Sequence, residues 1–130
     1  MGKPAAKQGD RITATDTHLI QPPGPVSPIP VPHQFSGIID GSLSSDVKIE
    51  GKAAATLTST ATNTPSHVPQ GGTFVIPPTN KGTIISGSAT VFINKKPAAR
   101  TGDKAITCND PAPLPVGTVV VPQSKVLIGG

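Results

Sequence analysis

The feature that most constrains the fold of this chain is a threefold internal repeat of a short, strand-rich unit. Each copy begins with a glycine and a β-branched run, passes through small polar residues and ends in a Val-x-Ile segment. The copies begin at Gly37, Gly82 and Gly117, and this glycine stands 10, 9 and 9 residues before the valine. Alternating β-branched residues bounded by Gly and Ser predict a strand, a turn and a second strand in each copy.

A second block of sequence follows two of these copies. Lys52 and Lys96 each stand five residues after the valine of their copy, and they open Lys-Ala-Ala-Ala and Lys-Pro-Ala-Ala-Arg. The third such block, Lys3–Lys7, stands at the other end of the chain. The third copy is therefore predicted to be split between residues 117–130 and residues 2–18. The simplest geometry is three units around a pseudo-threefold axis, with the first and last residues adjacent.

The three lysine blocks share the string Lys-x-Ala-Ala, and two of them match more closely. Lys96–Arg100 contains Pro-Ala-Ala-Arg and continues into Thr-Gly-Asp, and Lys3–Lys7 repeats the string with Lys in place of Arg. The middle block, Lys52–Ala55, lacks the proline, the basic residue and the Gly-Asp turn, which leaves the turn geometry of that copy open. On these phased blocks the chain resembles the PAAR-repeat family of spike-tip proteins. The resemblance implies an all-β, short-stranded cone or pyramid with pseudo-threefold symmetry, long irregular loops and a structural metal near the apex.

The composition predicts a thin hydrophobic core. The 130 residues include 16 Pro and 14 Gly, but only three Phe and no Tyr or Trp. Because aromatic side chains supply much of the burial in ordinary cores, something besides apolar burial is expected to stabilise this fold. Residues 1–130 are predicted to be a single domain with no fused effector domain. A proline-rich insertion at 21–33 is expected to be extended, like polyproline II, and unable to pair as a central strand.

Four side chains are candidate metal ligands: His18, His33, His67 and Cys108. His18 and His67 each stand 15 residues after the lysine of their block, and Cys108 stands 12 residues after its own. Three equivalent positions around one axis are expected to converge at one end of the molecule. His33 lies outside the repeat and is included by elimination. Three His and one Cys form a closed tetrahedral set that suits one structural Zn²⁺ per chain, and the family resemblance implies the same.

Other functional classes find less support in the sequence. In the alternative to a metal site, the three histidines are surface residues and Cys108 is a small buried hydrophobic residue. The net charge of +4 comes from scattered basic residues without interleaved aromatics, so no nucleic-acid site is predicted. No Gly-x-Ser-x-Gly, Walker or His-Glu-x-x-His motif occurs, and the protein is predicted not to be an enzyme. A small zinc-dependent hydrolase, and an adaptor that binds a separate effector on its loops, remain alternatives.

The resemblance implies a mechanical function. The protein would cap and sharpen the trimeric valine-glycine-repeat spike of a type VI secretion system, or a related phage tail spike, with one tip per trimer. It is expected to be a monomer on its own, to contact the target membrane mechanically and to recruit effector cargo. No signal peptide is visible, so we expect assembly in the cytoplasm and delivery by the injection machine. The residues predicted to form the spike-binding base are Val47, Ile49, Val91, Ile93, Val126 and Ile128.

Overall fold

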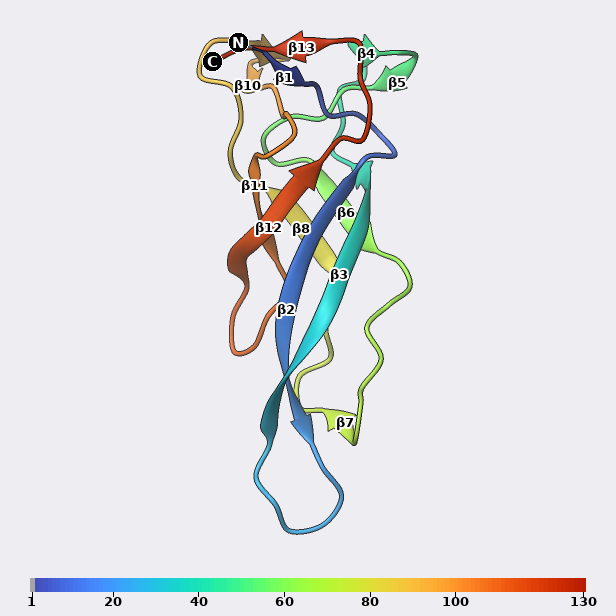
Figure 1. The fold of residues 1–130 in the computed structure, drawn as a ribbon, viewed down its shortest axis with the longest axis vertical. Helices are drawn as coiled ribbons and strands as arrows, with labels where there is room; N and C mark the ends of the chain where they lie inside the picture. The colour runs from blue at the N-terminus through green and yellow to red at the C-terminus, as the bar shows by residue number, and fades with distance from the viewer. Residues whose placement is uncertain (1) are drawn as a thin grey trace.

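A computed structural model describes residues 2–130, and in this range the protein consists of strands, turns and loops without a helix. It follows that no helix long and apolar enough to span a membrane is present in the described part of the chain. The molecule is elongated, with a broad end that holds both termini and a narrow end formed by one long hairpin (Figure 1). The strands are β1 (Lys3–Pro4), β2 (Arg11–Gln21), β3 (Ile29–Gly41), β4 (Lys48–Ile49), β5 (Lys52–Ala53), β6 (Thr60–Asn63), β7 (Thr73–Phe74), β8 (Lys81–Ile84), β9 (Phe92–Ile93), β10 (Lys96–Pro97), β11 (Lys104–Thr107), β12 (Leu114–Val120) and β13 (Leu127–Ile128).

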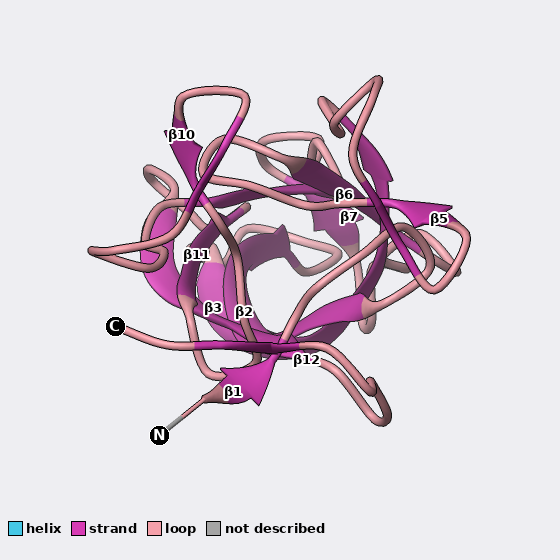
Figure 2. Ribbon diagram, turned by 90° about the horizontal axis from the view of Figure 1, so that it is seen from above, coloured by secondary structure: helices cyan, strands magenta, loops and turns pink. Residues whose placement is uncertain are grey.

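The central element is a six-stranded antiparallel sheet that closes on itself. Its order is β12-β11-β8-β6-β3-β2, and β12 pairs again with β2, while β7 adds to the outer part of β2. The closed ring of strands is seen end-on in Figure 2. The repeat glycines make room inside it, because a Cβ atom at Gly37 would lie 2.8 Å from Cε1 of the fully buried Phe35, and one at Gly82 would lie 3.2 Å from its Cζ.

The broad end of the molecule is built from three equivalent hairpins. β4 pairs with β5, β9 with β10, and β13 with β1, so that Ile49, Ile93 and Ile128 face the opening lysines of the three blocks in the same register. The third hairpin joins residues from the two ends of the chain, as the split repeat requires. The three hairpins occupy three corners around the axis of the closed sheet (Figure 2).

Backbone hydrogen bonds between the alanines of the three blocks form a closed cycle on this axis. Ala6 N donates to Ala99 O at 2.9 Å, Ala99 N to Ala55 O at 3.1 Å, and Ala55 N to Ala6 O at 3.1 Å. Three β-bridges between the residues that flank these alanines join the same three blocks. They pair Ala5 with Arg100, Ala98 with Thr56 and Ala54 with Lys7. Each block thus bonds to both of the others, and the pseudo-threefold cone predicted from the sequence is the observed fold.

The hydrophobic core is layered in sets of three. The layer under the hairpins contains Ala5, Ala54 and Ala98 with Ile49, Ile93 and Ile128. The next layer, inside the closed sheet, contains the fully buried Ile39, Ile84 and Val119, which each stand two residues after the glycine of their copy. Small residues on the axis and β-branched residues around it fill this interior, and only Phe35 supplies an aromatic ring. The core is therefore thin, in agreement with the composition.

The prediction of the spike-binding base needs a correction. Ile49, Ile93 and Ile128 are buried against the alanine layer, so they provide no contact surface. Because side chains alternate across a strand, the outward positions are the preceding residues, Lys48, Phe92 and Leu127. Of the predicted valines, Val47 and Val126 are exposed and Val91 is half-buried against the core. Their contact with a spike stays a prediction.

The turn that follows each block has the same form in all three copies. In two copies an aspartate closes the turn, where Asp10 accepts from Lys7 N at 3.0 Å and Asp103 accepts from Arg100 N at 2.7 Å. In the middle copy the Ser59 hydroxyl takes the place of the carboxylate and accepts from Thr56 N at 2.9 Å. The middle copy therefore keeps the turn geometry despite its altered sequence.

The middle turn retains a local strain that the other two avoid. Its φ-positive position is Thr58 (φ 78°), whereas the equivalent residues are Gly9 (φ 95°) and Gly102 (φ 87°). A β-branched residue is disfavoured there by roughly 1–2 kcal/mol. We expect Thr58→Gly to raise the free energy of unfolding by about 1 kcal/mol, and Gly102→Thr to lower it by at least as much. Denaturant unfolding with an unchanged m-value would measure both, and a destabilised Thr58→Gly variant would contradict the argument.

The proline-rich insertion is also corrected by the structure. Residues 29–33 do not form a free polyproline segment but belong to β3, where Ile29 pairs with Ile20 and Val31 with His18. Only residues 22–28 form the loop, at the narrow extreme of the molecule (Figure 1). Pro30 and Pro32 are tolerated because β3 is an edge strand in this region, paired with β2 alone. His33 is consequently held on a paired strand and not on a flexible segment.

Candidate metal centre

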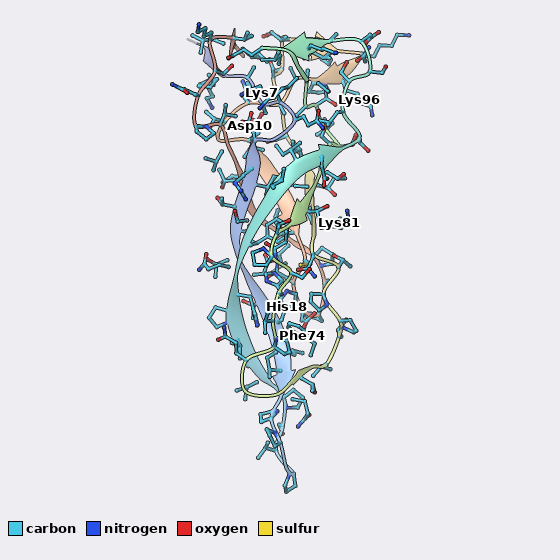
Figure 3. All side chains as sticks on the ribbon, turned by 90° about the vertical axis from the view of Figure 1, so that its right-hand side faces the viewer. Lys7, Asp10, His18, Phe74, Lys81 and Lys96 are labelled. Atoms are coloured by element: carbon cyan, nitrogen blue, oxygen red, sulfur yellow. The ribbon has the colours of Figure 1, made fainter. Side chains whose placement is uncertain are left out.

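The four predicted ligands come from four separate segments that meet in the narrow half of the molecule. His18 lies on β2 and His33 on β3, two positions along the hairpin from a direct pairing. His67 lies on the loop between β6 and β7, and Cys108 directly follows β11. Figure 3 shows His18 and Phe74 beside the long strands β2 and β3, in the half of the molecule away from the broad end. The structure thus brings all four together near one end, although metal binding itself stays a prediction.

The three histidine rings form a nearly equilateral triangle. Their centroids are 4.9 Å apart for His18 and His67, 5.3 Å for His33 and His67, and 5.4 Å for His18 and His33. Three imidazoles that bind one tetrahedral metal at about 2.0–2.1 Å have centroids about 5 Å apart. The rings are therefore already spaced as ligands of a single ion.

Cys108 and an aspartate complete the cluster. The Cys108 Sγ lies 3.7 Å from His18 Nε2, and Asp16 Oδ2 lies 3.4 Å from that sulfur and 2.9 Å from His67 Nε2. One ligand-type atom from each of Asp16, His18, His67 and Cys108 lies within 4.8 Å of the others, and all four residues are buried or half-buried. These groups offer two nitrogens, one sulfur and one carboxylate oxygen, a set that fits a four-coordinate ion. His33 is not part of this close group, although its ring lies beside it.

The hydrogen bonds of His33 point to the same use. Its Nδ1 lies 2.9 Å from the carbonyl oxygen of Val31 and is therefore assigned the proton that it donates. The other ring nitrogen, Nε2, is then an unprotonated acceptor, and it is buried without a hydrogen-bond partner. A histidine that donates through one nitrogen to a backbone carbonyl and leaves the other free is oriented as a metal ligand. This observation favours His33 independently of the elimination used above.

Asp16 is the residue that the sequence analysis missed. It is fully buried and accepts hydrogen bonds from His67 Nε2, Thr107 Oγ1 and Asn109 Nδ2. The signal was present in the sequence, because Asp16 and His18 are two residues apart and therefore share one face of a strand. A buried carboxylate needs compensating positive charge, and a metal dication in this cluster would supply it.

Burial sets the protonation of two groups in the site. Burial, reinforced by the neighbouring Asp16 carboxylate, raises the pKa of the Cys108 thiol to about 11. Burial also lowers the pKa of His18, against the opposing effect of Asp110, whose Oδ2 lies 3.5 Å from His18 Nδ1. In the absence of metal, His18 is therefore neutral at pH 7 and the thiol is protonated. A metal ion must displace the thiol proton when it binds.

An aromatic side chain covers the cluster on the side of the hairpin loop. The Phe74 ring, on β7, lies 5.7 Å from the ring of His18 and 5.6 Å from that of His33. β7 is held there by its pairing with Ile20 and Gln21 of β2. A cleft of about 440 Å³ opens on another side, where His33 and His67 contribute to its wall. A second, smaller cleft of about 140 Å³ is lined by His18 and Cys108, so the cluster borders two clefts.

Comparison with known proteins gives one match. A family model with the description PAAR motif matches residues 75–130, which include the Lys96–Arg100 block and Cys108. Neither a curated protein nor a solved structure matches the chain. The match supports a structural role of the spike-tip type for the fold and the metal cluster described above.

Proposed function

Because residues 75–130 belong to the PAAR-motif family, we propose that this protein is the tip that caps and sharpens the trimeric spike of a contractile injection machine. The observation that carries the proposal is the cycle of backbone hydrogen bonds among Ala6, Ala55 and Ala99. This cycle makes one chain approximately threefold-symmetric at its broad end. A single copy can then match the true threefold axis of a trimer, which favours one tip per spike.

The broad end has the features of a docking face. Its three hairpins lie at one level, and Phe92 and Leu127 are 56% and 60% exposed at two of the three corners (Figure 1). The third corner carries Lys48 in the equivalent position. Apolar side chains that are exposed on a docking face lose contact with water on binding, which favours association. We assign Phe92 and Leu127 as the main apolar contacts with the valine-glycine-repeat spike.

The role proposed for the metal is structural. Bound Zn²⁺ would supply four coordination bonds at His18, His33, His67 and Cys108, joining β2, β3, the 64–72 loop and the segment after β11. The chain's own residues orient these ligands: Val31 O fixes His33, and Asp16 lies against His67 and Cys108. The narrow half has few core residues, because the two core clusters lie in and above the closed sheet. A metal would replace the missing apolar burial there.

A hydrolytic function receives less support from the same site. A zinc hydrolase needs an open coordination position and a general base beside it. The cleft next to His33 and His67 is lined by Pro, Ser, Thr, Asn, Gln and Val residues and by no carboxylate. A second cleft beside His18 and Cys108 includes Asp110, but its Oδ2 already accepts a hydrogen bond from Leu19 N at 2.7 Å. Asp16 is fully buried and accepts from His67, Thr107 and Asn109. This arrangement favours a closed structural ion.

The proposal extends to location and membrane contact. We infer that the protein is a monomer until it docks, that it joins the spike in the cytoplasm, and that the injection machine delivers it to the target cell. The narrow end then meets the target membrane first. Effector cargo would bind on the loops at the side of the cone.

Stoichiometry tests the proposal. We expect native mass measurement of a complex with a trimeric valine-glycine-repeat spike protein to show one tip per trimer. The double variant Phe92→Asp/Leu127→Asp should lose binding, because it places charge at both apolar corners, whereas Val26→Ser at the opposite end should bind normally. Three tips per trimer, or a stable homotrimer of this chain alone, would contradict a single asymmetric cap.

A further inference from the structure

Two residues of the metal centre compete for one coordination position. His18, His67 and Cys108 belong both to the predicted ligand set and to the close group of ligand atoms. The predicted set adds His33, whereas the close group adds Asp16. A structural zinc ion is almost always four-coordinate. Five side chains therefore converge where an ion has room for four.

The donor atoms around Asp16 are spaced like ligands of one ion. Two ligands of a tetrahedral zinc ion lie about 3.3–3.6 Å apart, because each is bound at about 2.0–2.3 Å. The Asp16 Oδ2 atom lies 3.4 Å from Cys108 Sγ, and this sulfur lies 3.7 Å from His18 Nε2. The separation of Asp16 Oδ2 from His67 Nε2 is shorter, at 2.9 Å, because these two atoms share a hydrogen bond. The carboxylate oxygen thus already lies at ligand distance from the other donors.

Metal binding at the neighbouring ligands would deprive Asp16 Oδ2 of its hydrogen bonds. Thr107 Oγ1 and Asn109 Nδ2 donate to the other oxygen, Oδ1, and hold the fully buried carboxylate in place. Oδ2 accepts from His67 Nε2 and from the Cys108 thiol. Both of these donors lose their hydrogens when they become ligands. A buried carboxylate oxygen without a partner is costly, and direct coordination of the ion removes that cost.

His33 and Asp16 reach the cluster from one residue pair of the β2–β3 hairpin. They are direct partners in its register, and paired side chains project from the same face. His33 Nε2 is buried without a hydrogen-bond partner, and the ring lies 5.3 Å from that of His67 and 5.4 Å from that of His18. The ring also borders the cleft of about 440 Å³, which gives it space to move away from the cluster. The two side chains thus approach the same ion from the same face of the hairpin.

We propose that Asp16 Oδ2 and His33 Nε2 are alternative ligands for the fourth position of the metal centre. The ion then keeps four protein ligands when either residue is displaced, with His18, His67 and Cys108 as the constant set. The members of this constant set are those whose positions are phased in the sequence repeat. The inference rests on the proposed function for the presence of a structural divalent ion. Its consequence is a centre that tolerates movement of the β3 edge, because the ion does not depend on His33 alone.

A double-mutant cycle on the full chain tests the exchange. Zinc affinity is measured by competition with a chromogenic chelator for the wild type, His33→Ala, Asp16→Asn and the double variant. We expect each single change to weaken zinc binding about tenfold or less, because the other residue still binds. The double variant should bind zinc about 1000-fold more weakly, which exceeds the product of the single effects. Asp110→Asn is the matched control, since this carboxylate lies 3.5 Å from His18 Nδ1 but is not among the close ligand atoms. Its effect should simply multiply with that of His33→Ala.

A crystal structure of zinc-loaded His33→Ala gives a second measurement that needs no change at Asp16. We expect Asp16 Oδ2 at about 2.0–2.2 Å from the ion, and a water molecule in that position would overturn the exchange. Equal zinc affinities of His33→Ala and the double variant would overturn it too, as would single effects that simply multiply. A loss with Asp16→Asn as large as that of the double variant would make Asp16 an obligatory ligand and not an alternative one. None of these results alters the expected one tip per trimer, because spike binding uses the broad end of the molecule.

Discussion

Replacing Cys108 by serine is expected to weaken zinc binding at the metal centre and to lower the melting temperature more than any other single ligand change. A structural zinc site is worth roughly 10–16 kcal/mol over four ligands, so the loss of the thiolate should cost about 3 kcal/mol and reduce zinc affinity more than 100-fold. A serine hydroxyl does not ionise near neutral pH and is a poor replacement. Elemental analysis should find about one zinc per wild-type chain, in protein purified without added metal, and much less in Cys108→Ser.

His33→Ala provides the comparison for the cysteine variant. His33 lines the cleft of about 440 Å³, so its removal lets water reach the vacated coordination position. We therefore expect a smaller loss of zinc and of thermal stability than for Cys108→Ser. Chelator supplies the control, because it should remove zinc from both proteins and bring the wild type and Cys108→Ser to similar melting temperatures. A larger loss for His33→Ala would mean that the primary ligands are misassigned, and zinc-free wild type with an intact fold would remove the structural role of the metal.

Ile84→Ala is expected to have the largest effect among changes away from the metal. Ile84 is fully buried in the closed sheet, in the layer that it shares with Ile39 and Val119. Removing its buried methyl and methylene groups leaves a cavity that the hydrogen-bonded strands β6 and β11 on either side cannot close. The expected cost is about 2–5 kcal/mol in the free energy of unfolding.

The neighbouring Ile85 provides a matched control. It is the same residue type, one position along the chain, but 39% exposed. Ile85→Ala should cost under about 1 kcal/mol, because little packing is lost. Urea unfolding of both variants at one metal concentration measures the difference. Similar losses of stability for the two variants would mean that the layer of Ile39, Ile84 and Val119 inside the closed sheet does not form the core.

The fold could be predicted largely because the repeat is phased. The equal spacing of Lys3, Lys52 and Lys96 from the surrounding segments already implies three equivalent hairpins and adjacent termini, and the pairing of Lys3 with Ile128 agrees with this. What the spacing left open was the direction of each side chain. In a two-residue strand such as Leu127–Ile128, a shift of one position exchanges the buried and exposed faces, and the predicted base therefore included three buried isoleucines.

The candidate centre was predictable in part for a related reason. His18, His67 and Cys108 stand at comparable distances from their lysines, so the threefold pattern alone brings them together. His33 and Asp16 have no counterparts in the other copies, and their place depends on the β2–β3 hairpin, in which they are direct partners. The proline-rich composition predicted that this segment could not pair as a central strand. An edge strand tolerates prolines, however, and β3 pairs with β2 alone in this region. Local composition could not reveal that β3 is an edge strand at this point.

The cycle of hydrogen bonds through Ala6, Ala55 and Ala99 has a consequence for how this protein can diversify. In a trimer of identical subunits, every substitution appears three times around the axis, so groups that converge on that axis are always of one kind. Here three copies within one chain hold equivalent places while each mutates alone. One copy can thus present a sulfur where the others present imidazoles, and can close its turn with Ser59 where the others use aspartate. Unlike ligands at like positions are attainable only because the symmetry is covalently joined and inexact.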